Sequence, residues 1–122
     1  MSERPYKLSC HCGAIRFEVD AELTGLVECN CSTCRRHSFL HWKVPAAAVK
    51  LRTERVRLSA YVWRDLDGAH QFCPNCGTPI VRTGYSGGNV SINARCIEGI
   101  DVFGLEVRRY DGRNQMPPGP LP

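Results

Sequence analysis

The sequence contains no long hydrophobic run. Within its 122 residues, no stretch approaches the roughly 20 consecutive apolar residues that a transmembrane helix requires. The N-terminal stretch MSERPYKLSC also has no apolar segment of the kind that a signal peptide carries. These absences disfavour a membrane protein and an exported protein, so we expect a cytoplasmic location and no membrane partner.

An internal repeat is also absent. A chain of this length supports one domain with a modest core, because a small chain buries a limited share of its surface. We predict that this domain spans residues 1–114. Residues 115–122, QMPPGPLP, are rich in proline and are predicted to form an extended tail.

Cysteine, by contrast, is abundant, with eight residues in a short chain. A disulfide scaffold needs an oxidising compartment, which the absence of a signal peptide disfavours. In a reducing compartment, clustered cysteines favour metal ligation or thiol chemistry instead.

The formal charge of +4 would suit a nucleic-acid partner, but metal binding would change it. Two zinc ions and seven ionised thiols would lower this charge to about +1, because cysteine binds metal as a thiolate. A nearly neutral protein has little general attraction for phosphate backbones. The net charge therefore does not favour a nucleic-acid partner.

Short alternating segments indicate a mainly β fold. Ile15, Phe17 and Val19 alternate with polar residues, the period of two that is typical of a half-buried strand. Short helical turns are predicted at 32–38, where Ser32 would be the N-cap, and at 100–105. Further strands are predicted at residues 6–10, 39–44, 49–52, 56–63, 79–82, 90–94 and 106–110. We therefore predict a single zinc-stapled domain of antiparallel sheets with short helical turns.

Two cysteine pairs, far apart in the sequence, have the spacing of a zinc site. The segments CHCG (10–13) and CPNCG (73–77) each end on a glycine, which accepts the positive φ that such a turn needs. Tetrahedral zinc holds its sulfurs about 3.8 Å apart, so each pair must lie on a tight turn. Free buried cysteines would need neither the pairing nor the glycines. We predict a closed, structural zinc site made by Cys10, Cys12, Cys73 and Cys76.

A third segment, CNCSTCRRH (29–37), places three thiols on one loop. Catalytic zinc usually has three protein ligands and one exchangeable position. A thiol that enters this position is bound as a thiolate, which is the better nucleophile. Arg35 and Arg36 follow the cluster and are candidates for binding a substrate carboxylate. The segment can therefore hold a catalytic metal through Cys29, Cys31 and Cys34.

The fourth position of this site has several candidates. Cys96 could be the fourth ligand, which would make a second closed site, or it could be a reactive thiol. His37 or His41 could fill the same position. The thiols could also be free of metal and redox-active.

Three segments, in this order and spacing, resemble the glutathione-dependent formaldehyde-activating enzyme family, which also includes centromere protein V. They are LSCHCGAIRFEV, CNCSTCRR and HQFCPNCGTP, and the resemblance extends from about Leu8 to Arg113. The later segment SINARCIEGID is similar to the branch that contains centromere protein V, in which a cysteine occupies the position of Cys96.

The resemblance implies a zinc-stapled fold of the β-tent type with two zinc ions per chain. The four-cysteine group would hold the structural zinc, and Cys29, Cys31 and Cys34 would hold the functional one. The implied partner is a small-molecule thiol, glutathione. Its addition to formaldehyde gives S-hydroxymethylglutathione, which is formally a carbon–sulfur lyase reaction run in reverse.

A second hypothesis is a non-catalytic zinc module that binds nucleic acid or chromatin, by analogy with centromere protein V. Its local support is a basic segment, KLRTERVR (50–57), which contains Lys50, Arg52, Arg55 and Arg57. Charges on a solvated strand edge, which prevent aggregation, explain this segment equally well. The sequence therefore favours an enzyme that joins a thiol to a small aldehyde.

Overall fold

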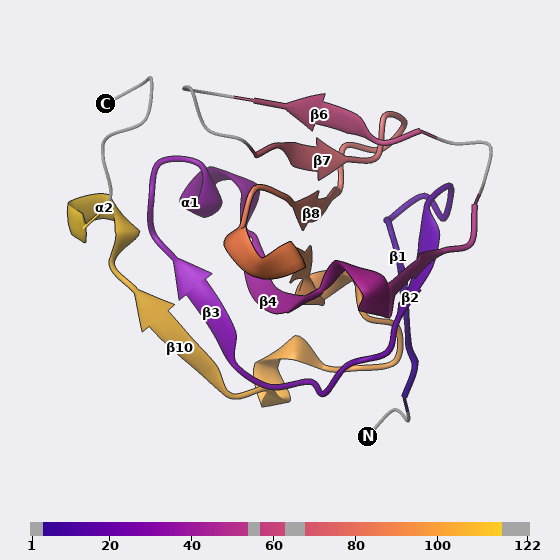
Figure 1. The fold of residues 1–122 in the computed structure, drawn as a ribbon, viewed down its shortest axis with the longest axis horizontal. Helices are drawn as coiled ribbons and strands as arrows, with labels where there is room; N and C mark the ends of the chain where they lie inside the picture. The colour runs from indigo at the N-terminus through magenta and orange to yellow at the C-terminus, as the bar shows by residue number, and fades with distance from the viewer. Residues whose placement is uncertain (1–3, 54–56, 63–67, 116–122) are drawn as a thin grey trace.

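The computed structural model describes residues 4–53, 57–62 and 68–115, and it shows two β-sheets that pack against each other (Figure 1). One sheet has three strands in the order β1-β2-β5, and the other has seven in the order β10-β3-β4-β9-β8-β7-β6. The strands are β1 (Tyr6–Ser9), β2 (Arg16–Val19), β3 (Leu26–Cys29), β4 (Leu40–Pro45), β5 (Val49–Leu51), β6 (Ser59–Tyr61), β7 (His70–Phe72), β8 (Pro79–Arg82), β9 (Asn89–Asn93) and β10 (Val107–Tyr110).

In the part of the chain that the structure describes, helical structure is limited to short segments of three or four residues. The α-helices are α1 (Cys34–His37) and α2 (Gly112–Gln115), and the 3-10 helices are η1 (Ala46–Ala48), η2 (Ser86–Gly88), η3 (Ala94–Cys96) and η4 (Val102–Gly104). The prediction of a mainly β domain with short helical turns is therefore confirmed.

Two details of the sequence prediction were wrong. The sheets are not wholly antiparallel, because β10 pairs with β3 in parallel after the chain crosses from β9 through η3 and η4. The N-cap of α1 is Thr33 rather than Ser32, and its side chain does not cap the helix. Instead, the Thr33 hydroxyl lies 3.4 Å from the Cys31 sulfur, so a thiol rather than a backbone amide is its partner.

The core lies between the two sheets and is centred on Trp42. This side chain is fully buried, packs edge-on against Tyr6 at 5.6 Å between ring centroids, and donates a hydrogen bond to the Glu22 carbonyl at 3.0 Å. Phe17 and Val19 bring the buried face of β2 to the same core, as their alternation predicted. The core therefore fixes how the two sheets sit relative to each other.

The two faces of the seven-stranded sheet have different chemistry. In β4, Leu40, Trp42 and Val44 are buried in the core, so His41 and Lys43 point to the opposite face. On that face, Ser91 of β9 lies opposite Lys43 on one side and Arg82 of β8 on the other. A polar row thus crosses the middle of the sheet, and it positions the site described below.

Some sequence predictions fall on the ends of the described ranges. The helix α2 includes Gln115, the first residue of the predicted tail, and residues 116–122 lie outside the described part of the chain. Arg55 of the basic segment also lies outside it. No helix within the described ranges has the length and the hydropathy to cross a membrane.

The position of Trp42 gives a stability prediction. We expect Trp42→Ala to lower the free energy of unfolding by about 3–5 kcal/mol, because it leaves a large cavity and removes the hydrogen bond to Glu22. Phe103→Ala is the matched control, since Phe103 is 93% exposed, and it should change this energy by less than about 0.5 kcal/mol. Urea denaturation measures both, and equal effects would contradict the described core.

Candidate functional site

The first cysteine cluster joins the two sheets. Cys10 and Cys12 follow β1, and Cys73 and Cys76 lie between β7 and β8. The Cys10 and Cys12 sulfurs are 3.6 Å apart, and those of Cys12 and Cys73 are 3.8 Å apart. All four sulfurs lie within 4.8 Å of one another. This spacing matches the separation of about 3.8 Å that four sulfurs take around a tetrahedral zinc ion.

Backbone geometry supports metal binding at this cluster. Gly13 and Gly77 both have φ of +80°, which confirms the conformation expected of the two glycines. Two backbone amides donate to the sulfurs of this cluster. The Ile15 amide donates to the Cys10 sulfur at 3.2 Å, and the Asn75 amide donates to the Cys73 sulfur at 3.4 Å. Such amide hydrogen bonds stabilise thiolates, the form in which cysteine binds metal.

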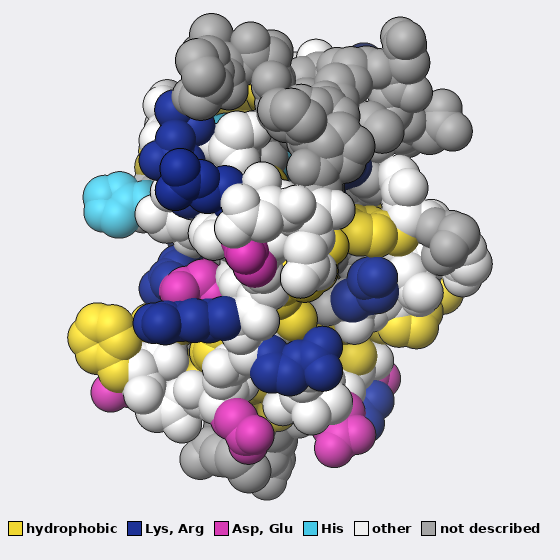
Figure 2. Space-filling model, turned by 90° about the vertical axis from the view of Figure 1, so that its left-hand side faces the viewer, with side chains coloured by type: hydrophobic (Ala, Val, Ile, Leu, Met, Phe, Trp, Pro, Cys, Tyr) yellow, Lys and Arg dark blue, Asp and Glu magenta, His cyan; other side chains and the backbone are white. Residues whose placement is uncertain are grey.

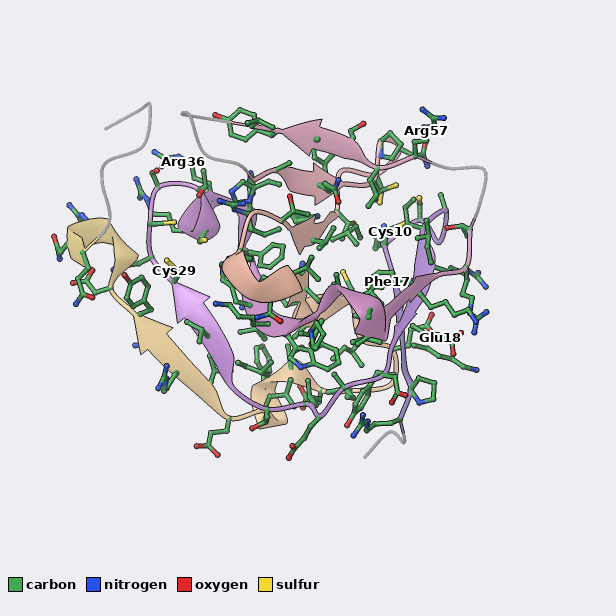
Figure 3. The ribbon with its side chains drawn as sticks, in the orientation of Figure 1. Cys10, Phe17, Glu18, Cys29, Arg36 and Arg57 are labelled. Carbon is green, nitrogen blue, oxygen red and sulfur yellow. The ribbon has the colours of Figure 1, made fainter. Side chains whose placement is uncertain are left out.

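The second cluster lies at the other end of the molecule, where Cys29 ends β3 and Cys34 begins α1 (Figure 3). Its three sulfurs also lie within 4.8 Å of one another, and Cys29, Cys31 and Cys34 are all buried. Two backbone amides of the loop donate to these sulfurs. The Cys31 amide donates to the Cys29 sulfur and the Cys34 amide donates to the Cys31 sulfur, each at 3.4 Å. The three sulfurs surround the centre of the cluster on one side, and no cysteine in the described ranges approaches this centre from the other side.

The loop stabilises negative charge on one of these sulfurs. A hydrogen bond with Cys34 is the main cause that lowers the pKa of Cys31 to about 4, and Thr33 adds to the effect. The same hydrogen bond, together with burial, raises the pKa of Cys34. The pKa values of the two neighbouring thiols are therefore shifted in opposite directions. These donors suit a thiophilic ion such as zinc.

Cys96 does not join the second cluster. Its sulfur lies 3.6 Å from the Pro79 carbonyl oxygen, and burial raises the pKa of this thiol to about 12. Charge on Cys10 and Cys76 adds to the rise, which places Cys96 beside the first cluster instead. A buried thiol with a raised pKa is a poor nucleophile, so the structure gives no support to Cys96 as a reactive thiol.

His41 is the histidine that touches the second cluster. Its Nε2 atom lies 3.1 Å from the Cys34 sulfur, and its Nδ1 atom lies 2.7 Å from the Ser91 hydroxyl. Nε2 is not among the atoms that all lie within 4.8 Å of one another, so His41 contacts Cys34 from beside the cluster. Burial lowers the pKa of His41 to about 4, so the ring is neutral near pH 7. A neutral ring held by Ser91 therefore positions the Cys34 sulfur beside the cluster.

His37, the other candidate for the fourth position, packs against a different partner. Its ring contacts that of His70 edge-on, at 5.3 Å between centroids. The pKa of each is lowered by burial, to about 4 for His70, so this pair is also uncharged near pH 7.

A cavity of about 350 Å³ opens over the three sulfurs. Strands from both halves of the seven-stranded sheet line it, since β3 and β10 contribute from one side and β7 and β8 from the other. No aspartate or glutamate is among its described lining residues. Its cationic lining residues are Lys43, Arg82 and Arg108.

A second cavity of about 390 Å³ shares Cys29 and Cys34 with the first. Its lining includes residues of both charges, and side chains of both signs are also mixed on this face of the molecule (Figure 2). Glu28 lies 3.7 Å from the guanidinium groups of both Arg95 and Arg109. The three-cysteine cluster therefore lies between a cavity whose described charged residues are all cationic and one that contains both acidic and basic residues.

The structure separates the two arginines that the sequence suggested for carboxylate binding. Arg35 lines the second cavity, whereas Arg36 points outward from α1 and donates a hydrogen bond to the Ser32 carbonyl at 2.9 Å (Figure 3). Sequence reasoning missed Lys43, Arg82 and Arg108. The alternation of His41 and Lys43 along β4 was the available signal, but it identifies a shared face only once the neighbouring strands are known.

The basic segment proposed for nucleic acid lies elsewhere. Lys50 is exposed on β5, an edge strand of the three-stranded sheet, and Arg52 forms an ion pair with Glu18 of β2. The pairing of Arg52 with an acidic residue is typical of a solvated strand edge.

The placement of Cys96 gives a metal-binding prediction. We expect Cys96→Ser to leave the metal capacity of the protein unchanged, because serine keeps a donor toward Pro79 and the three sulfurs of the second cluster are untouched. Cys31→Ser removes one of those three sulfurs and should reduce this capacity. Titration with Co²⁺, followed by sulfur-to-cobalt absorption, measures both variants. A Cys96→Ser protein that binds less cobalt than the wild type would contradict this placement.

Comparison with known proteins agrees with this arrangement. A solved crystal structure of a protein from Rhodobacter sphaeroides, a structural genomics target, has a TM-score of 0.74 to this chain at 26% sequence identity. The match covers 85% of this chain and 99% of that one. A family model described as glutathione-dependent formaldehyde-activating enzyme matches residues 5–103, which include both cysteine clusters. The chain therefore belongs to the glutathione-dependent formaldehyde-activating enzyme family.

Proposed function

We propose that this protein is a zinc-dependent enzyme that adds a thiol, glutathione in particular, to formaldehyde or a similar small aldehyde. The observation that carries this proposal is the three-sulfur cluster at the base of a cavity, with no fourth cysteine beside it. The volume of the cavity, about 350 Å³, lies within the range of small-molecule sites. Family membership supports the choice of glutathione and formaldehyde.

The proposal assigns different roles to the two clusters. Cys10, Cys12, Cys73 and Cys76 would hold a structural zinc, since four sulfurs close the site. The other three cysteines would hold a functional zinc. A reducing compartment such as the cytoplasm would keep all eight cysteines as free thiols, as they are in the structure.

The reaction needs a thiolate and a nearby carbonyl group. Zinc, when bound, favours the thiolate form of a thiol that completes its ligand set. The sulfur then forms a bond to the carbonyl carbon, and the carbonyl π electrons move to oxygen, which takes up a proton. The thiol loses one proton and the oxygen gains one. The overall reaction therefore joins a thiol and formaldehyde in a hydroxymethyl thioether.

The chain itself contributes position and charge. His41, oriented by Ser91, fixes Cys34, and the loop amides fix the other two sulfurs. The cavity walls hold the thiol substrate over the cluster, which raises the effective concentration of the two reactants. Such positioning is an adequate mechanism for an addition that needs little other chemistry.

The two clusters should differ in how firmly they hold metal. We expect two zinc ions per chain, with the zinc of the three-sulfur cluster lost first to a chelator, because it has one fewer protein ligand. Loss of the other zinc should unfold the domain, since closed zinc sites contribute folding energy. Elemental analysis with parallel circular dichroism follows both steps. One zinc ion per chain, or simultaneous loss of both, would contradict the assignment.

The activity can be followed by NMR exchange between glutathione and its formaldehyde adduct. We expect the zinc-loaded protein to accelerate this exchange above the buffer rate. Cys31→Ser should abolish the acceleration while the first zinc and the circular dichroism spectrum are retained. Cys96→Ser is the matched control and should keep wild-type activity. A wild-type rate equal to that of buffer would rule out the proposed reaction.

A further inference from the structure

Two cations in the site are held on one aromatic ring. The Lys43 ammonium lies 4.5 Å from the centroid of the Tyr85 ring, and the Arg82 guanidinium lies 5.7 Å from it. Lys43 is on β4 and Arg82 is on β8, so their backbones are about 10 Å apart with β9 between them. Both side chains nevertheless converge on Tyr85, and we refer to the three residues as the Lys43–Tyr85–Arg82 clamp.

Among the residues that the structure describes, no acidic group neutralises the clamp. Within the described ranges, neither Lys43 nor Arg82 forms an ion pair, and no carboxylate lines the cavity that they share with Arg108. Two like charges held near each other repel, so the arrangement is favourable when an anion lies between or beside them.

With zinc bound, the three-cysteine cluster would neutralise only part of the positive charge of the cavity. Three thiolates and one zinc ion carry a net charge of about −1, whereas the cavity has three cationic side chains. Counting only the described lining residues, about two positive charges therefore remain unmatched inside the cavity. The neighbouring cavity differs in this respect, because Glu28 already pairs with Arg95 and Arg109 there.

We propose that the Lys43–Tyr85–Arg82 clamp is a carboxylate-binding site that selects thiol substrates carrying a carboxylate. The inference rests on the proposed function, since it assumes that the thiol of the same molecule reaches Cys29, Cys31 and Cys34. The two cations donate to the carboxylate, and Tyr85 holds them in place through cation–π contacts. Arg108 lines the same cavity and adds to its positive field.

Calorimetry of the zinc-loaded protein tests the clamp with glutathione and its diethyl ester, which has the same thiol but no carboxylate. We expect the wild type to bind glutathione at least tenfold more tightly than the diester, because charge-assisted hydrogen bonds are lost in the ester. Lys43→Met should reduce this preference by roughly tenfold, with little change in binding of the diester. Lys43→Arg should retain the preference, since it keeps the charge.

Controls separate the clamp from general effects. Lys50→Met removes an exposed lysine on the other sheet and should leave the preference unchanged. Arg82→Met is the second test of the clamp, and Arg82→Lys is its charge-retaining control. Circular dichroism confirms that each variant is folded before binding is measured.

The outcomes distinguish this inference from the proposed function. Equal binding of glutathione and diester, or a preference that survives both Lys43→Met and Arg82→Met, overturns the clamp even if the thiol exchange is accelerated. A preference for glutathione that both variants remove supports the clamp. If that result came without acceleration of exchange, it would overturn the proposed reaction and leave the carboxylate site standing.

Discussion

Four sulfurs meet where the two sheets come together, and a metal ion bound there would connect the two sheets directly. Cys10 and Cys12 extend from the three-stranded sheet, and Cys73 and Cys76 lie in a turn of the seven-stranded sheet. A chain of this size buries a limited share of its surface, so its core alone gives modest stability. A metal ion on these sulfurs would stabilise the contact between the sheets. The core around Trp42 then needs to cover only one face of the seven-stranded sheet, and the other face is available for the site.

That second face explains the chemistry of the site. Alternation along β4 sends Trp42 into the core and His41 and Lys43 into the cavity, so one strand both stabilises the fold and forms the site. The three-cysteine loop closes the cavity at the end of β3. Since the cavity combines three cysteine sulfurs with cations that form no ion pair within the described residues, it suits a small anionic thiol better than a neutral or cationic molecule.

The sequence predicted the parts of the structure that depend on local spacing. Both cysteine groups follow from spacing alone, and Gly13 and Gly77 have the positive φ that the tight turns require. The clamp could not be predicted, because Lys43 and Arg82 meet only through the strand order β4-β9-β8. Proximity in sequence also could not place Arg36, which donates a hydrogen bond to the Ser32 carbonyl.

In the proposed function, the last ligand position of the second cluster belongs to the sulfur of a thiol substrate. X-ray absorption at the zinc edge tests it directly, because it counts the sulfur neighbours averaged over both zinc ions. We expect about 3.5 sulfurs per zinc in the free protein, because one zinc has four sulfur ligands and the other has three. The average should rise to about 4 after addition of glutathione and should not rise with S-methylglutathione. A count of about 4 in the free protein, or no change on adding glutathione, would contradict it.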